Sequence, residues 1–230
     1  IKFLKESRAR AQERIITQLQ ENEQLKDKVN RELEQKVQKR TAELKRKNKD
    51  IIDSINYAQR LQSSVLTTPS QLENLLPNSA VFFRPKDILS GDFLWVNETD
   101  RYKYFAVIDC TGHGVPGALM SIMANNNLNA IVREHQPLPG ELLEILDTRV
   151  KSLIKISDDD FENYGMDVSL VALDKNTNQG YYAGAFNPLW KVTKNKFEEL
   201  KANRYPVGHY FFKPEEKKVQ THQFQLEKNT

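Results

Sequence analysis

Residues 82–126 read FFRPKDILSGDFLWVNETDRYKYFAVIDCTGHGVPGALMSIMANN, and the order of acidic, apolar and glycine residues in this stretch decides the fold. The apolar run 104–108 is short and rich in β-branched and aromatic residues, which favours a buried strand over a helix. Asp109 stands at the end of this run, and Asp92 precedes a second apolar run. A glycine-rich turn at 111–117 is followed by a helical pattern. The stretch therefore predicts strand, turn, strand, acidic elbow and helix.

The two aspartates of this stretch need a positive partner, because burying an unpaired charge carries a large desolvation penalty. Mg²⁺ and Mn²⁺ bind oxygen ligands in octahedral geometry and keep several waters. Asp92, Asp109 and one backbone carbonyl are therefore enough protein ligands for such an ion. The sequence has no cluster of histidines and cysteines, so these residues favour Mg²⁺ or Mn²⁺ as the bound metal.

Two motifs of the stretch, SGDFLW and DCTGHGVPGALMS, resemble those of the SpoIIE-like branch of the metal-dependent Ser/Thr protein phosphatases (the type 2C or PPM superfamily). In that branch the first Asp follows a Gly, and the second opens an Asp-x-(Ser/Thr)-Gly-His-Gly elbow. The resemblance extends more weakly through three later motifs, GMDVSL at 165–170, YAGAFNP at 182–188 and YPVG at 205–208. Together these motifs predict a phosphatase domain over residues 78–230.

The resemblance implies phosphoester hydrolysis at a site that holds two Mn²⁺ or Mg²⁺ ions. Asp92 would bridge both ions, Asp109 would hold them directly or through ordered water, and the carbonyl of Cys110 would add a ligand. The Cys110 thiol itself is interpreted as a small buried hydrophobe. Asp167 is a further candidate, as a metal ligand, as a partner of the ligands or as a cap at a strand end. His113 is a candidate general acid toward the leaving serine or threonine oxygen, or a structural hydrogen-bonding residue.

The order of the later elements predicts a segregated α+β fold. Two strands are followed by two helices and then by several turn-separated strands, which reads as an antiparallel meander. The resemblance implies an αββα sandwich of two antiparallel sheets flanked by helices. The aromatic residues Phe82, Phe83, Phe93 and Trp95 are expected in the core, and the acidic triplet 158–160 in a solvated loop. The helices are expected at 118–135 and 141–156, and the strands at 168–173, 181–185, 189–193 and 218–224.

Residues 1–66 contain no proline and no glycine and predict one long helix or two nearly continuous ones. Val37, Leu44 and Ile51 recur every seven residues, and Ala58 and Val65 continue the series, which is typical of a coiled-coil dimer. A solvated helix with many charge pairs is the alternative. Residues 33–44 also resemble the linker that joins bacterial sensor domains to output domains. We therefore expect a coiled-coil signalling helix and linker at 1–66, below an upstream sensor for which a membrane receptor is one option.

The end of the sequence departs from the resemblance. The family continues into a strand and an Asp-Gly turn that supplies another metal-binding aspartate, and the sequence stops before such a turn. We therefore expect a partial catalytic domain, incomplete at its C-terminus, whose activity by itself is in question.

Composition limits the classes of protein that fit. A net charge of +3, with basic residues concentrated in the first fifty and mixed with glutamates, makes nucleic acid a poor partner. The single cysteine excludes an internal disulfide framework and fits a reducing cytoplasm. The sequence has no apolar run long enough for a membrane span. A cytoplasmic location, free or at the inner face of the membrane through an upstream sensor, is therefore expected.

Two functions from different classes remain open on the sequence. The first is a metal-dependent phosphatase that acts on phosphoserine or phosphothreonine in a regulatory protein, as the output module of a bacterial sensor. The resemblance implies a small anti-sigma-factor antagonist as its substrate. The second is a non-catalytic dimeric signalling scaffold with a phosphatase-like fold. The two converging aspartates favour the first, and the missing last aspartate favours the second.

Overall fold

The computed structural model describes residues 2–153, 164–193, 196–209 and 218–226. Its contacts divide the chain into two compact units, residues 1–54 and 55–230. Helix α1 (Lys2–Val65) makes up the first unit and contributes its last turns to the second. The prediction of one long N-terminal helix is therefore confirmed. None of the helices in the described ranges is both long and apolar enough to cross a membrane.

The apolar stripe of α1 is open to solvent in the single chain. Leu44 and Ile51 are 63% and 56% exposed, and Val37 is 57% exposed. Charge pairs also form along the helix, for example between Glu43 and Lys47 at 3.5 Å. The single chain therefore has both an exposed apolar stripe, as a coiled-coil dimer requires, and charge pairs, as a solvated helix requires. The coiled-coil dimer stays a prediction.

A short helix follows where a simple break was expected. The hydroxyl of Thr68 accepts a hydrogen bond from the backbone N–H of Gln71, and the Gln71 side chain accepts one from the Thr68 N–H. This reciprocal capping, with proline in the first turn, starts helix α2 (Pro69–Leu75). Helix α1 ends at Val65, and Pro69 begins the next helix.

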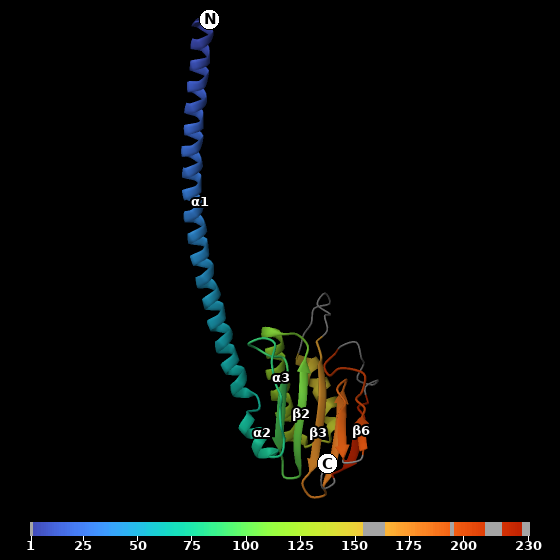
Figure 1. Ribbon diagram of the computed structural model, residues 1–230. Helices are drawn as coiled ribbons and strands as arrows, with labels where there is room; N and C mark the ends of the chain where they lie inside the picture. The colour runs from blue at the N-terminus through green and yellow to red at the C-terminus, as the bar shows by residue number, and fades with distance from the viewer. Residues whose placement is uncertain (1, 154–163, 194–195, 210–217, 227–230) are drawn as a thin grey trace. The chain divides into compact units, whose positions relative to one another are not determined.

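Five antiparallel strands form the main sheet, in the order β1-β2-β3-β4-β7 (Figure 1). The predicted antiparallel meander is confirmed, and β5 has the predicted bounds. The helices begin earlier than expected, and β7 begins later. The elements are α3 (Gly114–His135), α4 (Pro139–Leu153), β1 (Phe93–Glu98), β2 (Tyr102–Cys110), β3 (Met166–Asp174), β4 (Gln179–Ala185), β5 (Leu189–Thr193), β6 (Lys196–Leu200) and β7 (His222–Gln225).

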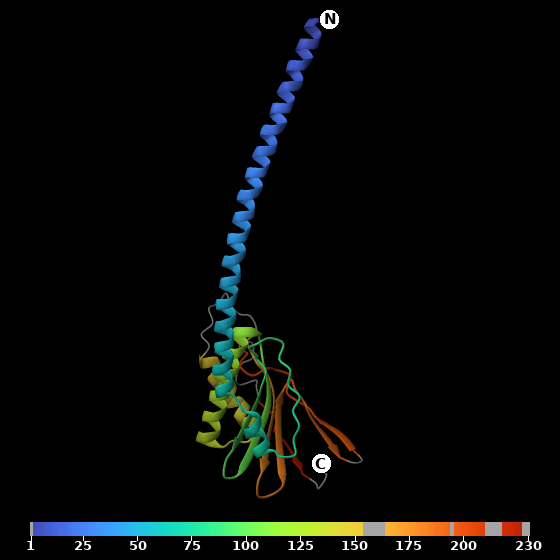
Figure 2. The same cartoon turned by 60° about the vertical axis from the view of Figure 1, so that its left-hand side comes forward.

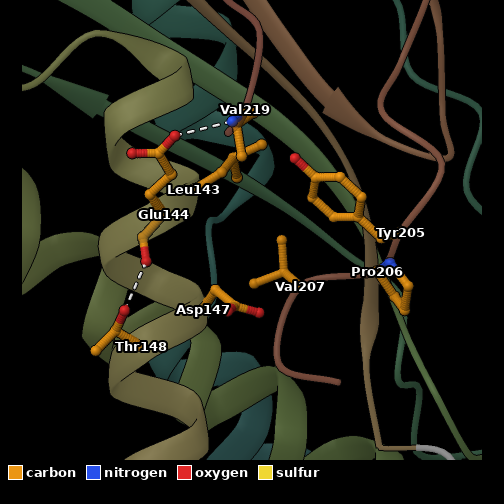
Figure 3. Close-up of a pocket in the computed structure, with 8 residues that line it drawn as sticks. All are labelled: Leu143, Glu144, Asp147, Thr148, Tyr205, Pro206, Val207 and Val219. Atoms are coloured by element: carbon orange, nitrogen blue, oxygen red, sulfur yellow. Dashed lines mark hydrogen bonds between the residues drawn. The ribbon is translucent and has the colours of Figure 1, made fainter. Parts of the chain in front are cut away.

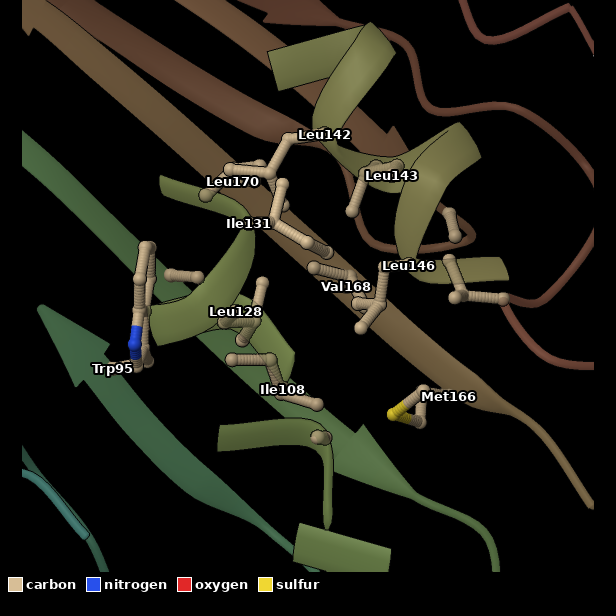
Figure 4. Packing of buried hydrophobic residues seen from close by; sticks show 14 of the residues in the cluster. Trp95, Ile108, Leu128, Ile131, Leu142, Leu143, Leu146, Met166, Val168 and Leu170 are labelled. Atoms are coloured by element: carbon tan, nitrogen blue, oxygen red, sulfur yellow. The ribbon is translucent and has the colours of Figure 1, made fainter. Parts of the chain in front are cut away.

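The core lies between the main sheet and helices α3 and α4 (Figure 4). Alternate residues of each strand face these helices, so that Ile108 and Val168 pack against Leu128 and Leu146, all of them at most 1% exposed. Each such side chain contributes roughly 1.5–3 kcal/mol by leaving water. This packing makes the sheet a rigid platform for the residues on its other face.

The second sheet, the hairpin of β5 and β6, packs on the opposite face of the main sheet (Figures 1 and 2). Leu189 and Leu200 contact Val171 and Tyr182 in a second, smaller cluster of apolar residues. Helices, a five-stranded sheet and a two-stranded sheet therefore follow one another in layers. The predicted α+β class with two antiparallel sheets is confirmed.

Two of the four aromatic residues expected in the core are not in it. Phe93 and Trp95 are buried, but Phe82 is 93% exposed and Phe83 is 49% exposed. Both belong to an irregular segment that precedes β1, where no strand turns alternate side chains inward. The acidic triplet 158–160 lies outside the described residues.

Candidate metal centre

The pairing of β1 with β2 brings the two predicted aspartates together. Phe93 and Ile108 form the last pair of this ladder, and Asp92 and Asp109 are the residues next to that pair in the sequence. Their carboxyl groups lie within hydrogen-bonding reach of each other. Partial burial, this hydrogen bond and the charge of Asp109 together raise the pKa of Asp92 to about 6. Two carboxylates held this close disfavour a second negative charge unless a cation joins them.

Asp167 stands directly opposite Asp109 in the ladder between β2 and β3. Their neighbours Ile108 and Val168 face the helices, so both aspartates lie on the face of the sheet that carries the second sheet. Partial burial and, to a smaller extent, the charge of Asp109 raise the pKa of Asp167. Within the described ranges, however, no three acidic, histidine or cysteine side chains gather closely enough to hold a metal ion.

Two glycines, Gly91 and Gly117, allow the turn before Asp92 to pack closely against the backbone at 110–112, just after Asp109. A Cβ on Gly91 would lie 2.8 Å from the Cys110 carbonyl oxygen, and one on Gly117 would lie 2.5 Å from that of Gly112. Only hydrogen fits at these two positions, because the neighbouring atoms are backbone. The Cys110 carbonyl is therefore held against Gly91, the residue before Asp92, and its role as a metal ligand stays a prediction.

The thiol of Cys110 lies on the other side of the strand, in the core. It is 2% exposed, and burial, with smaller contributions from Asp109 and Asp92, raises its pKa far above the ordinary value. A buried thiol that resists ionisation behaves as a small apolar side chain, as predicted.

His113 directly precedes helix α3 and has a partner that the sequence did not suggest. Its Nδ1 lies 3.2 Å from a carboxylate oxygen of Asp87, and both side chains are exposed, by 78% and 42%. Asp87 reads in the sequence as an ordinary loop charge. No periodicity connects two loop residues so far apart, so this pairing could only be found in the structure.

A pocket of about 420 Å³ opens beside Asp92 and Asp109. Asn187, from the turn between β4 and β5, also lines the pocket. In the sequence this residue belongs to the YAGAFNP motif. The other lining residues are apolar and come from the segment before β1 and from β1 and β2: Ala80, Val81, Phe82, Phe83, Phe93, Leu94, Val107 and Ile108. The exposed Phe82 and Phe83 thus form part of a pocket wall.

The last turns of α1 connect to the same region. Gln62 is only 5% exposed, and its amide donates hydrogen bonds to the Ser90 carbonyl and the Ser121 hydroxyl. Asn125 of α3 donates to the carbonyl of Val65, near the end of α1. A pocket of about 610 Å³ between this helix end and residues 81–94 also includes Asp92. Leu66 also packs against the core, whereas Leu61 and Val65 stay 50% and 41% exposed.

A separate pocket of about 210 Å³ lies between α4 and residues 205–207, away from these aspartates (Figure 3). Two acidic residues of this pocket accept hydrogen bonds from backbone N–H groups. Asp147 accepts a hydrogen bond of 2.7 Å from the Gly208 N–H, and Glu144 accepts one of 2.8 Å from the Val219 N–H. These carboxylates therefore join α4 to Gly208 and Val219, and Asp92 and Asp109 remain the candidate site.

Comparison with known families decides the assignment. The profile of the family Stage II sporulation protein E (SpoIIE) matches residues 99–230, more than half of the chain. The chain belongs to the SpoIIE family. The match covers Asp109, Cys110, His113 and Asp167 and begins after Asp92. SpoIIE-type domains are phosphatases of the type 2C superfamily, so the suspected resemblance is confirmed.

One solved structure supports the fold of this SpoIIE-family chain, and two others are similar at a lower score. The SiaA-PP2C domain of Pseudomonas aeruginosa matches with 27% identity and a TM-score of 0.67, over 78% of this chain and 69% of that one. The phosphatase domain and part of the regulatory domain of SpoIIE from Bacillus subtilis match with 18% identity and a TM-score of 0.49, over 60% and 38%. The RsbU and RsbW domains of Rv1364c from Mycobacterium tuberculosis match with 16% identity and a TM-score of 0.49, over 63% and 38%. No curated protein sequence matches the chain.

Proposed function

We propose that the chain is the catalytic part of a Mn²⁺- or Mg²⁺-dependent phosphatase that hydrolyses phosphoserine or phosphothreonine in a regulatory protein. The observation that carries the proposal is the contact between the carboxyl groups of Asp92 and Asp109 at the ends of adjacent strands. A scaffold protein gains nothing from two carboxylates that repel each other. A metallophosphatase needs such a pair, because divalent cations with oxygen ligands hold the phosphoryl group in this kind of site.

The donor set fits the ions. Asp92 and Asp109 supply carboxylate oxygens, the carbonyl of Cys110 stands beside them, and Asp167 adds a carboxylate across the ladder. All of these are hard oxygen donors, which suit Mg²⁺ or Mn²⁺. Two such ions, when bound, would lower the pKa of water and offset the negative charge of the phosphoryl oxygens.

The remaining candidate residues would have the following roles. His113 would donate a proton to the leaving serine or threonine oxygen, and Asp87 would hold its imidazole by the 3.2 Å contact at Nδ1. In that arrangement Nε2 is the nitrogen that meets the substrate. The apolar wall at 80–83 would receive the residues that flank the phosphorylated side chain and limit the access of water.

The N-terminal helix would connect the site to its input and to a partner chain. The exposed stripe of α1 supports a homodimer through a coiled coil, and the signalling linker at 33–44 supports a sensor upstream. A small anti-sigma-factor antagonist in the cytoplasm remains the proposed substrate, on the resemblance alone.

One observation favours the alternative, a non-catalytic scaffold. Three metal-holding side chains do not come together in the part of the chain that the structure describes. A site with too few carboxylates binds its ions weakly, and such a domain would bind a partner without turnover.

The test is hydrolysis of a phosphoserine peptide by the chain, with Mn²⁺ and with a chelator, beside a longer form of the protein. Asp109→Asn is the inactive control, and Asp100→Asn, an exposed turn residue on the same sheet, is the matched control. We expect metal-dependent release of phosphate that Asp109→Asn abolishes and Asp100→Asn preserves. If neither form releases phosphate at saturating Mn²⁺, the scaffold is established.

A further inference from the structure

The turn between β4 and β5 holds one residue in an unfavourable backbone conformation. Phe186 has a φ of 60°, in the left-handed region that side chains other than glycine rarely adopt. Such a conformation persists only where the surrounding structure fixes it, and it is concentrated at functional sites. The turn follows the buried end of β4 and leads directly into Asn187.

Hydrogen bonds fix this turn from two sides. The Phe186 N–H donates to the Asn203 carbonyl at 2.9 Å, and Asn203 donates to the Gly184 carbonyl through both its backbone N–H and its side chain, at 2.9 and 3.0 Å. The Tyr182 hydroxyl donates to the Asn187 carbonyl at 2.7 Å. The backbone of Asn187 is therefore anchored by contacts that do not involve its side chain.

The side-chain amide of Asn187 is available to a ligand of the pocket. Across the described ranges, no hydrogen bond engages its amide, although the residue is only partly exposed. It lines the 420 Å³ pocket together with Asp92 and Asp109. Among the described residues that line this pocket, Asn187 is the one whose side chain carries N–H donors, since the rest are apolar or acidic.

We propose that Asn187 binds substrate: its side-chain amide donates a hydrogen bond to a phosphoryl oxygen of the phosphomonoester held beside Asp92 and Asp109. The identity of the ligand rests on the proposed phosphatase function. A phosphoryl group carries several acceptor oxygens and needs donors in addition to cations. A lysine or arginine at this position would form an ion pair with Asp92 or Asp109 and occupy the place of the cation. A neutral amide supplies the donor without that competition.

The test replaces the donor and keeps the size of the side chain. Asn187→Leu removes the amide, and Asn187→Asp replaces it with an acceptor of nearly the same shape. Asn178→Asp is the matched control, because Asn178 lies in the exposed turn between β3 and β4, at the other end of β4 from Asn187. The melting temperature of each variant shows whether the fold is retained.

The first readout is binding of inorganic phosphate to the Mn²⁺-loaded chain, measured by calorimetry, with the affinity for Mn²⁺ measured separately. We expect Asn187→Leu to weaken phosphate binding by about tenfold, as for a lost hydrogen bond to a charged group, while Mn²⁺ affinity stays within about twofold. Asn187→Asp weakens phosphate binding further by repulsion. Phosphate affinities of both variants equal to that of the wild type, or no phosphate binding by the wild type, would overturn the inference.

Hydrolysis of a phosphoserine peptide is scored independently. A chain that binds phosphate through Asn187 but releases none from the peptide contradicts the phosphatase and leaves the role of Asn187 standing. Hydrolysis whose kcat/KM is the same in both Asn187 variants contradicts the role of Asn187 and leaves the phosphatase standing. We expect hydrolysis in the wild type and a higher KM in Asn187→Leu.

Discussion

The side-chain amide of Gln62 donates a hydrogen bond of 2.6 Å to the carbonyl of Ser90, two residues before Asp92. The same amide donates a bond of 2.8 Å to the Ser121 hydroxyl on α3. One buried polar side chain thus joins the end of the long helix to the turn that carries Asp92 and to the helix that follows the acidic elbow. A polar contact of this kind fixes position more sharply than an apolar contact, because it is directional.

Gln62→Leu should therefore destabilise the second unit. The change removes the side-chain donor of the partly buried Ser90 carbonyl and the partner of the buried Ser121 hydroxyl, which costs about 1–3 kcal/mol. Gln59→Leu, one turn earlier on the same helix and exposed, is the control and should change stability by less than about 0.5 kcal/mol. Urea unfolding monitored at Trp95 measures both. Equal midpoints for Gln62→Leu and the wild type would show that the contact does not hold the helix end.

Asp92→Asn should stabilise the metal-free protein at neutral pH. The folded pKa of Asp92, about 6, lies above the ordinary 3.8, so the folded protein binds this proton more tightly than the unfolded chain does. The resulting stability is fully present below pH 3.8 and is lost as pH rises through about 6. Because the group is largely exposed, we expect a gain on the order of 1 kcal/mol for the variant at pH 7.

The same variant should show little gain at pH 4, where Asp92 is mostly protonated in the folded protein. Denaturant unfolding in chelator at pH 4, 5.5 and 7 measures the difference, with Asp100→Asn as the control for a general charge effect. A difference between variant and wild type that does not depend on pH would contradict the close contact of the two carboxyl groups.

Gly117→Ala sets helix propensity against a backbone contact. In an exposed helix interior, alanine is more favourable than glycine by about 1 kcal/mol. At this position the new Cβ would lie 2.5 Å from the Gly112 carbonyl oxygen and 3.1 Å from the Cα of Gly91. We expect the contact to win and the protein to lose about 1–3 kcal/mol. Asn126→Ala, on the exposed face of the same helix, should stabilise instead, and stabilisation by both in thermal unfolding would contradict the close packing of turn and elbow.

The sequence predicts well those features that repeat or that end a regular element. The apolar run 104–108 placed Asp109 at a strand end, and the alternation of turns and short strands predicted the meander and the bounds of β5. The long helix follows from the absence of proline and glycine over 66 residues. These signals are local, so the packing of the whole domain does not change them.

The start of α2 has a local signal: Pro69 reads as a helix breaker, but Thr68 and Gln71 have the spacing of a capping box. Features that depend on distant contacts could not be predicted. Gln62 is a polar residue in a helix whose sequence pattern is set by its apolar positions, yet its side chain bonds Ser90 and Ser121. The pair of Asp87 and His113 joins two loops, and no periodic signal brings loops together. The backbone angle of Phe186 follows from bonds to Asn203, seventeen residues later in the sequence.

His113→Gln should separate a catalytic role from a structural one. A general acid speeds departure of a poor leaving group such as serine by roughly 10²–10⁴-fold, but p-nitrophenolate leaves without a proton. In the metal-loaded protein we therefore expect a large loss of kcat for a phosphoserine peptide and a small one for p-nitrophenyl phosphate. His135→Gln, at the other end of α3 and also exposed, is the control. Equal losses on both substrates would assign His113 a structural role.

Replacing Leu44 and Ile51 together by asparagine should dissociate a dimer formed through α1. These residues are 63% and 56% exposed in the single chain and stand seven residues apart, so one seam of a coiled coil would bury both. Each lost apolar contact in such a seam removes about 1.5–3 kcal/mol per helix, which exceeds what charge pairs along the surface can replace. The control pair is Ala42→Asn with Lys49→Asn, which has the same spacing on the opposite side of the helix. Light scattering should give the mass of two chains for the wild type and the control, and of one chain for the seam variant. A wild type that has the mass of one chain, or a seam variant with the mass of two, would leave α1 as a solvated helix whose charge pairs stabilise it alone.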